Sequence, residues 1–166
     1  MIRIEKLMVK RVTTVDVDDS VLDATKIMNS HNIGCLVVLE KDRVAGILTE
    51  RDLLKRVLET CRNPDATKVH EVMTSRIVFG SPDMQLTEAT RLMFANRIKK
   101  LPILEDDMLV GLITLTDVAR ATRTDEQTMK LIEALSNMHI LGETSGNPGV
   151  AESAQTVHMK NNRQNK

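Results

Sequence analysis

The sequence contains an internal repeat, and this repeat limits the possible folds more than any other feature. Residues 4–56 align without a gap with residues 69–121, at the offset of 65 positions that separates Asp52 from Asp117. A solenoid generally needs three or more repeats, so two copies predict two halves packed about a pseudo-twofold axis. Residues at matched positions are identical in many places, including Met8/Met73, Arg11/Arg76, Asp18/Asp83, Ala24/Ala89, Met28/Met93, Gly46/Gly111 and Thr49/Thr114.

Each copy has the pattern of a β-α-β-β-α unit. A short alternating stretch is typical of a strand, a stretch with apolar residues three and four positions apart is typical of a helix, and a continuous apolar run is typical of a buried strand. In the first copy these patterns predict strands at residues 11–17, 35–39 and 44–48, a helix beginning at Val21, and a second helix beginning at Thr49. In the second copy they predict strands at 77–79, 101–104 and 109–113, a helix at 85–96, and a helix beginning at Thr114.

These patterns predict an α+β fold with five segments. The first repeat occupies residues 1–60 and the second occupies residues 69–122, with a linker at 61–68 in which Pro64 disfavours helix at Asn63. Residues 123–141 are predicted to form a C-terminal amphipathic helix. Residues 142–166 are rich in Gly, Ser, Asn, Gln and Lys, a composition that predicts a disordered tail.

The composition excludes several classes of function. Lysine and arginine together equal aspartate and glutamate, and the chain has no Trp, no Tyr and only two Phe residues. Zero net charge and missing aromatic platforms both disfavour nucleic-acid binding. No apolar run is long enough to span a membrane, and no signal peptide is visible. The two cysteines are too few for a disulfide framework. We therefore expect a cytoplasmic protein without a membrane anchor.

The sequence also offers little support for catalysis or metal binding. His31, His70, His139 and His158 are scattered and have no acidic partner at metal-ligand spacing. No nucleophile–base pair and no glycine-rich phosphate loop is visible. We expect neither a catalytic site nor a metal site.

A Thr-x-x-Asp motif follows the last strand of each copy, at Thr49–Asp52 and at Thr114–Asp117. One interpretation is structural, because a threonine and an acid at this spacing cap the first turn of a helix. Another is functional, because the free N–H groups and the hydroxyl can face a phosphate while the carboxylate accepts hydrogen bonds from ribose hydroxyls. The recurrence of the motif in the same context favours the functional interpretation without excluding the cap.

The tandem β-α-β-β-α units, each ending in Gly-h-h-Thr-x-x-Asp (h, apolar), resemble a pair of CBS domains, the cystathionine-β-synthase-type repeats that form a Bateman module. The resemblance covers about residues 1–122. It implies two clefts between the repeats, each able to hold an adenine nucleotide or a related adenosyl ligand. One cleft would use Ile47, Thr49, Asp52, Ile77, Val78, Ile98, Lys99 and Lys100. The other would use Leu112, Thr114, Asp117, Val12, Thr13, Ile33 and Gly34.

The two clefts are expected to differ. The resemblance implies phosphate-facing basic residues at the positions of Lys99 and Lys100, so the first cleft is expected to prefer more phosphate, whereas their counterparts Gly34 and Cys35 carry no charge. The alternative for the lysines is a solvated pair at a helix end.

The leading hypothesis is therefore a stand-alone regulatory module that binds AMP, ADP, ATP or S-adenosylmethionine and signals by a change in packing. The resemblance also implies a disc-like homodimer. The rival hypothesis is an interaction adaptor with empty clefts that recruits an effector protein.

Overall fold

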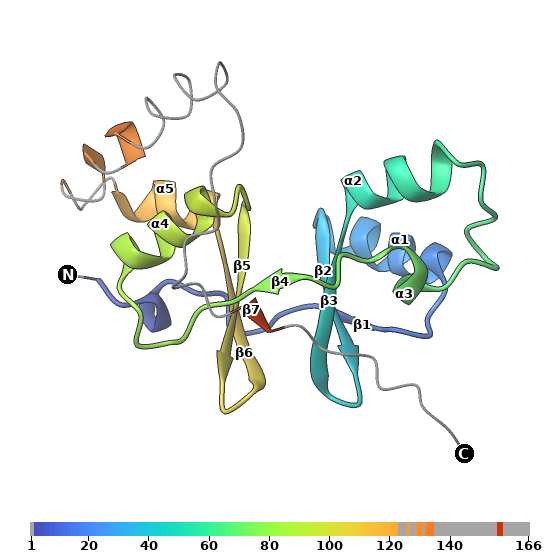
Figure 1. Cartoon of the computed structure of the whole chain (residues 1–166), viewed down its shortest axis with the longest axis horizontal. Helices are drawn as coiled ribbons and strands as arrows, with labels where there is room; N and C mark the ends of the chain where they lie inside the picture. The colour runs from blue at the N-terminus through green and yellow to red at the C-terminus, as the bar shows by residue number, and fades with distance from the viewer. Residues whose placement is uncertain (1, 123–125, 127–128, 131, 135–155, 158–166) are drawn as a thin grey trace. The chain divides into compact units, whose positions relative to one another are not determined.

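The computed structural model describes residues 2–122, 126, 129–130, 132–134 and 156–157, which form two compact units (Figure 1). Each unit has its own hydrophobic core. The repeat-1 unit contains Val12–Ile77 and residues 156–157. The repeat-2 unit contains residues 2–11 together with the described residues from Val78 to 134. The N-terminal residues therefore belong to the core of the repeat that follows later in the sequence.

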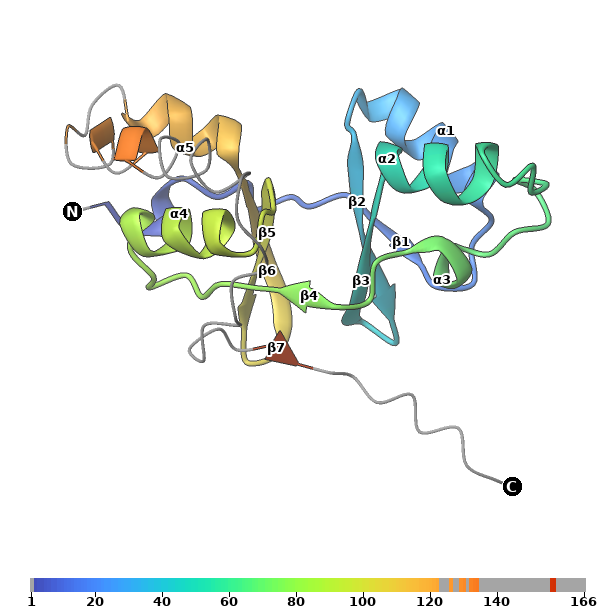
Figure 2. The same ribbon diagram turned by 45° about the horizontal axis from the view of Figure 1, so that its top comes forward.

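The repeat-1 unit is a three-stranded sheet with helices packed against it (Figure 2). Its elements are β1 (Thr14–Asp16), α1 (Val21–His31), β2 (Cys35–Glu40), β3 (Arg43–Thr49), α2 (Glu50–Leu53), a π-helical turn η2 (Leu54–Leu58) and α3 (Val69–Val72). β1 runs parallel to β2, and β2 runs antiparallel to β3. The apolar faces of these elements meet in one core that includes Val21, Ala24, Leu36, Leu48 and Val57.

Local capping explains where α1 begins and ends. The Ser20 hydroxyl accepts a hydrogen bond from the backbone N–H of Asp23, and Asn32 ends the helix in the left-handed conformation at φ 52°. Both residues are typical of these positions. Hydrogen bonds from Lys26 and Ser20 to the Asp23 carboxylate hold the pKa of Asp23 below its usual value.

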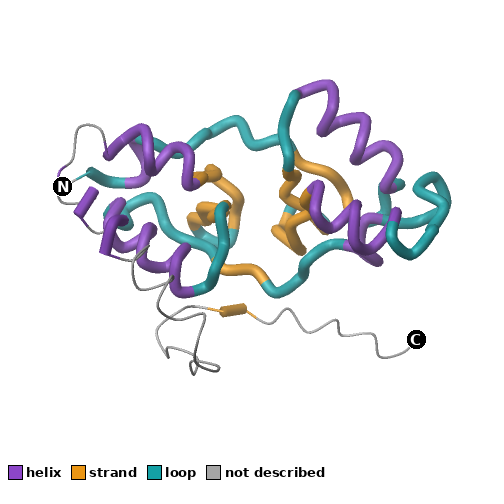
Figure 3. The backbone as a smooth tube through the Cα atoms, turned by 90° about the horizontal axis from the view of Figure 1, so that it is seen from above, coloured by secondary structure: helices purple, strands orange, loops and turns teal. Residues whose placement is uncertain are grey.

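The repeat-2 unit repeats this order in a smaller sheet. Its elements are η1 (Ile4–Lys6), α4 (Leu86–Ala95), β5 (Lys100–Glu105), β6 (Met108–Thr114) and α5 (Leu115–Thr122). β4 (Ile77–Val78) lies at the boundary between the units and forms a separate two-stranded sheet with β7 (Thr156–Val157), which is grouped with the repeat-1 unit. Figure 3 shows the strands of each unit in orange and the helices in purple. The core includes Ile4, Leu86, Met93, Leu101 and Val118. An isolated parallel bridge between Gly80 and Ile103 stands where β1 pairs with β2 in the other unit.

The hairpins of the two units are alike in detail. Each has a two-residue turn in which both residues have positive φ, Lys41 and Asp42 in one and Asp106 and Asp107 in the other. Such turns match the natural twist of the strands. Each hairpin also has a register irregularity at the same position, between Val38 and Leu39 and between residues 103 and 104.

The first residues of each repeat pack on the other repeat. Met8 lies against Gly111, and Val9 exchanges two backbone hydrogen bonds with Leu112. Sixty-five positions later, Met73 lies against Gly46, and Thr74 exchanges two backbone hydrogen bonds with Ile47. We call residues 2–11 and 69–77 the exchange segments.

The fold class predicted from the sequence, α+β with two β-α-β-β-α repeats, is confirmed. Of the predicted C-terminal helix, residues 126, 129–130 and 132–134 are helical, and Ile132 packs against the repeat-2 core. The remainder of residues 123–141 lies outside the described residues. The predicted tail lies outside them too, apart from β7.

Candidate functional site

The Thr-x-x-Asp motif of the repeat-1 unit lies where β3 ends and α2 begins. Thr49 has an extended conformation, and its backbone N–H and hydroxyl donate to Asp52 Oδ2 at 2.9 and 2.6 Å. The backbone N–H of Asp52 donates to Thr49 Oγ1 at 3.3 Å. This is a complete capping box, so the structural interpretation of the motif is confirmed here.

The motif of the repeat-2 unit has the same geometry. Thr114 donates to Asp117 Oδ2 from its backbone N–H at 2.9 Å and from its hydroxyl at 2.6 Å, and Asp117 N–H donates to Thr114 Oγ1 at 3.3 Å. In both motifs a single carboxylate oxygen, Oδ2, accepts the capping hydrogen bonds. The cap therefore leaves the second oxygen, Oδ1, available to other donors, and capping does not preclude a role in binding.

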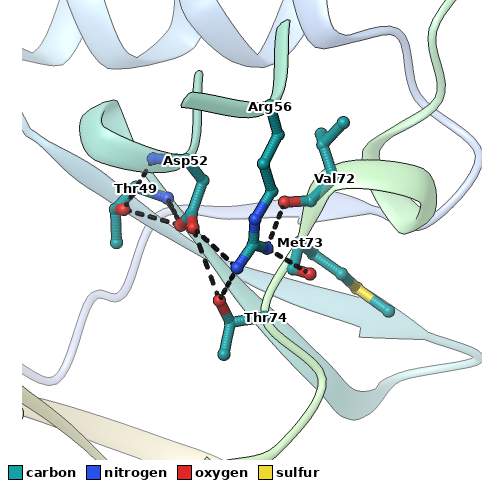
Figure 4. Close-up of polar contacts among 6 residues, drawn as sticks. All are labelled: Thr49, Asp52, Arg56, Val72, Met73 and Thr74. Carbon is teal, nitrogen blue, oxygen red and sulfur yellow. Dashed lines mark hydrogen bonds and ion pairs between the residues drawn. The ribbon is translucent and has the colours of Figure 1, made fainter. Parts of the chain in front are cut away.

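The surroundings of Oδ1 differ between the repeats, and Figure 4 shows those in the repeat-1 unit. Asp52 Oδ1 lies 3.4 Å from Arg56 Nη2 and 3.4 Å from Thr74 Oγ1. The positions that correspond to Arg56 and Thr74 in the repeat-2 unit are Ala121 and Val9, whose side chains carry no hydrogen-bonding group. Asp52 thus has a cationic neighbour that the repeat does not supply to Asp117.

Arg56 joins α3 to this site. Its Nη1 donates to the backbone oxygens of Val72 and Met73 at 2.7 and 2.8 Å, and its Nη2 donates to Thr74 Oγ1 at 3.3 Å. The side chain of Arg56 is 44% exposed, whereas that of Asp52 is 13% exposed. Sequence reasoning did not identify Arg56. Two features of the sequence could have indicated its role. Arg56 follows Asp52 by four positions, the spacing of an ion pair on a helix, and the matched position in the second repeat is Ala121.

The predicted site residues are divided between the two units. The repeat-1 unit holds Ile47, Thr49, Asp52, Ile77, Val12, Thr13, Ile33 and Gly34, and the repeat-2 unit holds Val78, Ile98, Lys99, Lys100, Leu112, Thr114 and Asp117. All are partly buried except Lys99, which is exposed. Each predicted cleft draws residues from both units, so the two clefts stay predictions.

Matched backbone contacts connect some of these positions with the motifs. The Gly34 oxygen accepts from Glu50 N–H at 3.2 Å, and the Lys99 oxygen accepts from Leu115 N–H at 3.0 Å. The side chains at these positions differ. A Cβ at Gly34 would lie 2.8 Å from Glu50 Oε2, so an acidic group covers this glycine. The matched positions in the repeat-2 unit carry a lysine and a leucine.

Within the described residues, no group of three or more His, Cys, Asp or Glu side chains could hold a metal ion. In the same part of the chain, no helix is both long enough and apolar enough to cross a membrane.

Comparison with known proteins identifies the family. The family model described as the CBS domain matches residues 4–59 and again residues 69–123. The chain belongs to the CBS-domain family. Both matched stretches contain the capping motif described above. Resemblance to a tandem CBS pair, inferred from the repeat and the Thr-x-x-Asp motifs, is thereby confirmed.

Relatives of this CBS-domain chain include two curated proteins. It is 32% identical over 140 residues to the CBS domain-containing protein YhcV of Bacillus subtilis, covering 84% of this chain and 99% of that protein. It is 38% identical over 109 residues to the mitochondrial CBS domain-containing protein CBSX3 of Arabidopsis thaliana. That match covers 63% of this chain and 53% of the plant protein, so the chain spans about half the length of this relative.

Among solved structures, the chain is similar to a hexameric CBS-CP12 protein from bloom-forming cyanobacteria. The TM-score is 0.67 at 25% sequence identity, and the match covers 87% of this chain and 86% of that one.

Proposed function

We propose that this CBS-domain pair is a non-catalytic regulatory module that binds an adenosyl ligand, either an adenine nucleotide (AMP, ADP or ATP) or S-adenosylmethionine. The observation that supports this most directly is the pair of identical capping boxes, in which Oδ2 of a partly buried aspartate is used by the cap. Oδ1 can then accept hydrogen bonds from ribose hydroxyls, because an ionised carboxylate has about four lone-pair sites. CBS modules generally bind adenosine ligands, which favours this ligand class.

The two sites would have different preferences. Lys99 and Lys100 belong to the predicted Asp52 cleft and favour phosphate, whereas the Glu50 carboxylate over Gly34 adds negative charge to the predicted Asp117 cleft. A nucleotide with more phosphate would therefore bind at Asp52. A ligand with less phosphate, or with the positive charge of S-adenosylmethionine, would bind at Asp117.

The proposal includes a homodimer and a cytoplasmic location. Leu54 and Leu58 lie four positions apart on η2 and are 59% and 67% exposed, so they present an apolar strip that a second copy could cover. The cyanobacterial neighbour is hexameric, which shows that a protein of this fold can self-associate.

Calorimetric titration of the full chain with AMP, ATP and S-adenosylmethionine tests the proposed function. We expect saturable binding by the wild-type protein. Asp52→Ala should weaken nucleotide binding at one site by tenfold or more, about 1.4 kcal/mol or more, and leave the other site unchanged. Asp117→Ala should have the converse effect.

Because each aspartate closes a capping box from the N3 position, each alanine variant also loses some stability. Asp52→Asn and Asp117→Asn are matched controls, since an amide oxygen can still accept the capping bonds. Absence of binding by every adenosyl ligand to the folded wild-type protein would instead support an adaptor that recruits an effector through its surface.

A further inference from the structure

Arg56 connects the carboxylate of Asp52 with the exchange segment 69–77, and every group involved lies within the repeat-1 unit (Figure 4). Its guanidinium bridges the carbonyl oxygens of Val72 and Met73, the hydroxyl of Thr74 and Oδ1 of Asp52. A guanidinium has five donors in a rigid plane and no acceptor, so it can serve several oxygens at once. We call Arg56 with these four partners the Arg56 latch.

The lengths of these contacts show which of them yields first. The two bonds to backbone carbonyls, at 2.7 and 2.8 Å, are short, as expected for a charged donor. The contact with Asp52 Oδ1 is 3.4 Å long, beyond the usual range for such a bond. Arg56 is therefore held mainly by the end of α3, and its contact with Asp52 is the one that a competing donor can replace most easily.

Oδ1 is also the oxygen that a ligand would use. Oδ2 already accepts from both the backbone N–H and the hydroxyl of Thr49. A ribose that donates to Oδ1 would compete there with Arg56 Nη2 and with the Thr74 hydroxyl, which lies 3.4 Å away. Binding at Asp52 would thus remove one side of the latch.

The other side of the latch is the segment by which the chain leaves the repeat-1 unit. Thr74 exchanges backbone hydrogen bonds of 2.9 and 3.0 Å with Ile47, and three residues later the chain reaches Ile77, where this unit ends. The repeat-2 unit has Ala121 and Val9 at the matched positions and cannot form the same latch. Any coupling of this kind is confined to one repeat.

We propose that the Arg56 latch couples occupancy of Asp52 to the stability of the segment Val72–Thr74. Arg56 acts as a positioning residue that competes with the ligand for Oδ1, as the Thr74 hydroxyl does. Ligand binding therefore removes the contact between Thr74 and Asp52 and leaves the guanidinium that holds Val72–Thr74 without its carboxylate partner. Linkage makes the effect reciprocal, since a ligand shifts an equilibrium only by its differential affinity for the two states. This inference rests on the proposed function, because it takes Asp52 as the group that receives the ligand.

Amide hydrogen exchange in the full chain tests the latch without ligand. Arg56→Gln should speed exchange in peptides containing Thr74 severalfold, whereas Lys55→Gln, which removes one positive charge from the adjacent exposed position, should not. Arg56→Lys keeps the charge but lacks the planar fork, so it should resemble Arg56→Gln. Wild-type exchange at Thr74 in both Arg56 variants would overturn the latch.

Titration with AMP then tests the coupling. Saturating AMP should speed exchange at Val72–Thr74 in the wild-type protein, and it should cause no further change in Arg56→Gln. The same variant should bind AMP at Asp52 severalfold more tightly, because the competitor is gone. Weaker binding by Arg56→Gln, or unchanged exchange in the AMP-bound wild type, would overturn the coupling. If the wild type binds no adenosyl ligand, the proposed function fails, while the exchange rates measured without ligand still report on the latch.

Discussion

Two glycines show how closely single residues are fitted in this protein. A Cβ at Gly46 would lie 2.7 Å from Met73 Sδ and 2.9 Å from the backbone oxygen of Thr74. At Gly111, all three of the nearest atoms belong to the side chain of Met8. A flexible methionine can move aside. The Thr74 carbonyl, in contrast, accepts a hydrogen bond from Ile47 N–H and cannot move aside without breaking it.

The difference predicts unequal effects of one substitution at matched positions. Gly46→Ala should lower the free energy of unfolding by about 1–3 kcal/mol, as expected for overpacking, and Gly111→Ala should lower it less. Urea denaturation followed by circular dichroism measures both. Adding Met8→Ala to Gly111→Ala should recover part of the loss at Gly111. Equal losses at the two glycines would contradict the distinction between side-chain and backbone contacts.

Individual residues also show how much of the candidate site could be predicted from the sequence. Thr49 and Asp52 are three positions apart, so their capping geometry follows from local spacing alone, and it was predicted. Arg56 finds two of its acceptors in the backbone carbonyls of residues 72 and 73. Every residue type has such a carbonyl, so no sequence pattern marks those positions as partners of an arginine.

At the scale of elements, hydrophobic periodicity was enough to place the strands and longer helices of both repeats. The short helices η1 and α3 were not predicted, because three or four residues are too few to show a period. The exchange of segments was not predicted either. A 65-residue repeat shows that residues 4–10 and 69–75 are equivalent. Equivalent segments could each pack on their own repeat or on the other one, and the sequence does not distinguish between these two arrangements.

The helix that follows Thr49 also allows a prediction about assembly. Leu54 and Leu58 are exposed on η2, and burying both against a second copy would remove a large apolar area from water. If the protein forms the proposed dimer, Leu54→Glu with Leu58→Glu should shift its mass to that of a monomer in concentration-dependent light scattering. Lys55→Glu is the control, because it adds a carboxylate to the same helix at a position that was polar already. A wild-type mass equal to one chain at every concentration would exclude the proposed dimer.

At the scale of the whole molecule, the exchange segments decide which core each terminal residue stabilises. Ile4 is fully buried in the repeat-2 core, and its matched residue Val69 is fully buried in the repeat-1 core. Each residue therefore stabilises the core of the other repeat, not the core of the repeat to which it belongs in the sequence.

This arrangement predicts crossed effects of two matched truncations. Ile4→Ala should destabilise the repeat-2 unit by about 2–5 kcal/mol, because it leaves a cavity. Faster amide exchange is then expected in α4 and β5, and unchanged exchange in α1 and β2. Val69→Ala should give the opposite pattern at a smaller cost, since a smaller side chain is removed. Faster exchange in α1 after Ile4→Ala, with α4 unaffected, would show that the N-terminal segment packs on its own repeat.

The exchange segments also fix an order of events during synthesis. Once Ile77 has emerged from the ribosome, all of Val12–Ile77 is available to fold. Residues 2–11 must wait until β5, β6 and α5 have been made, more than a hundred residues later, which takes on the order of ten seconds. During that interval the apolar side chains of Ile4 and Leu7 lack the core that they enter in the folded protein, so the repeat-2 core can close only after the repeat-1 unit has been made.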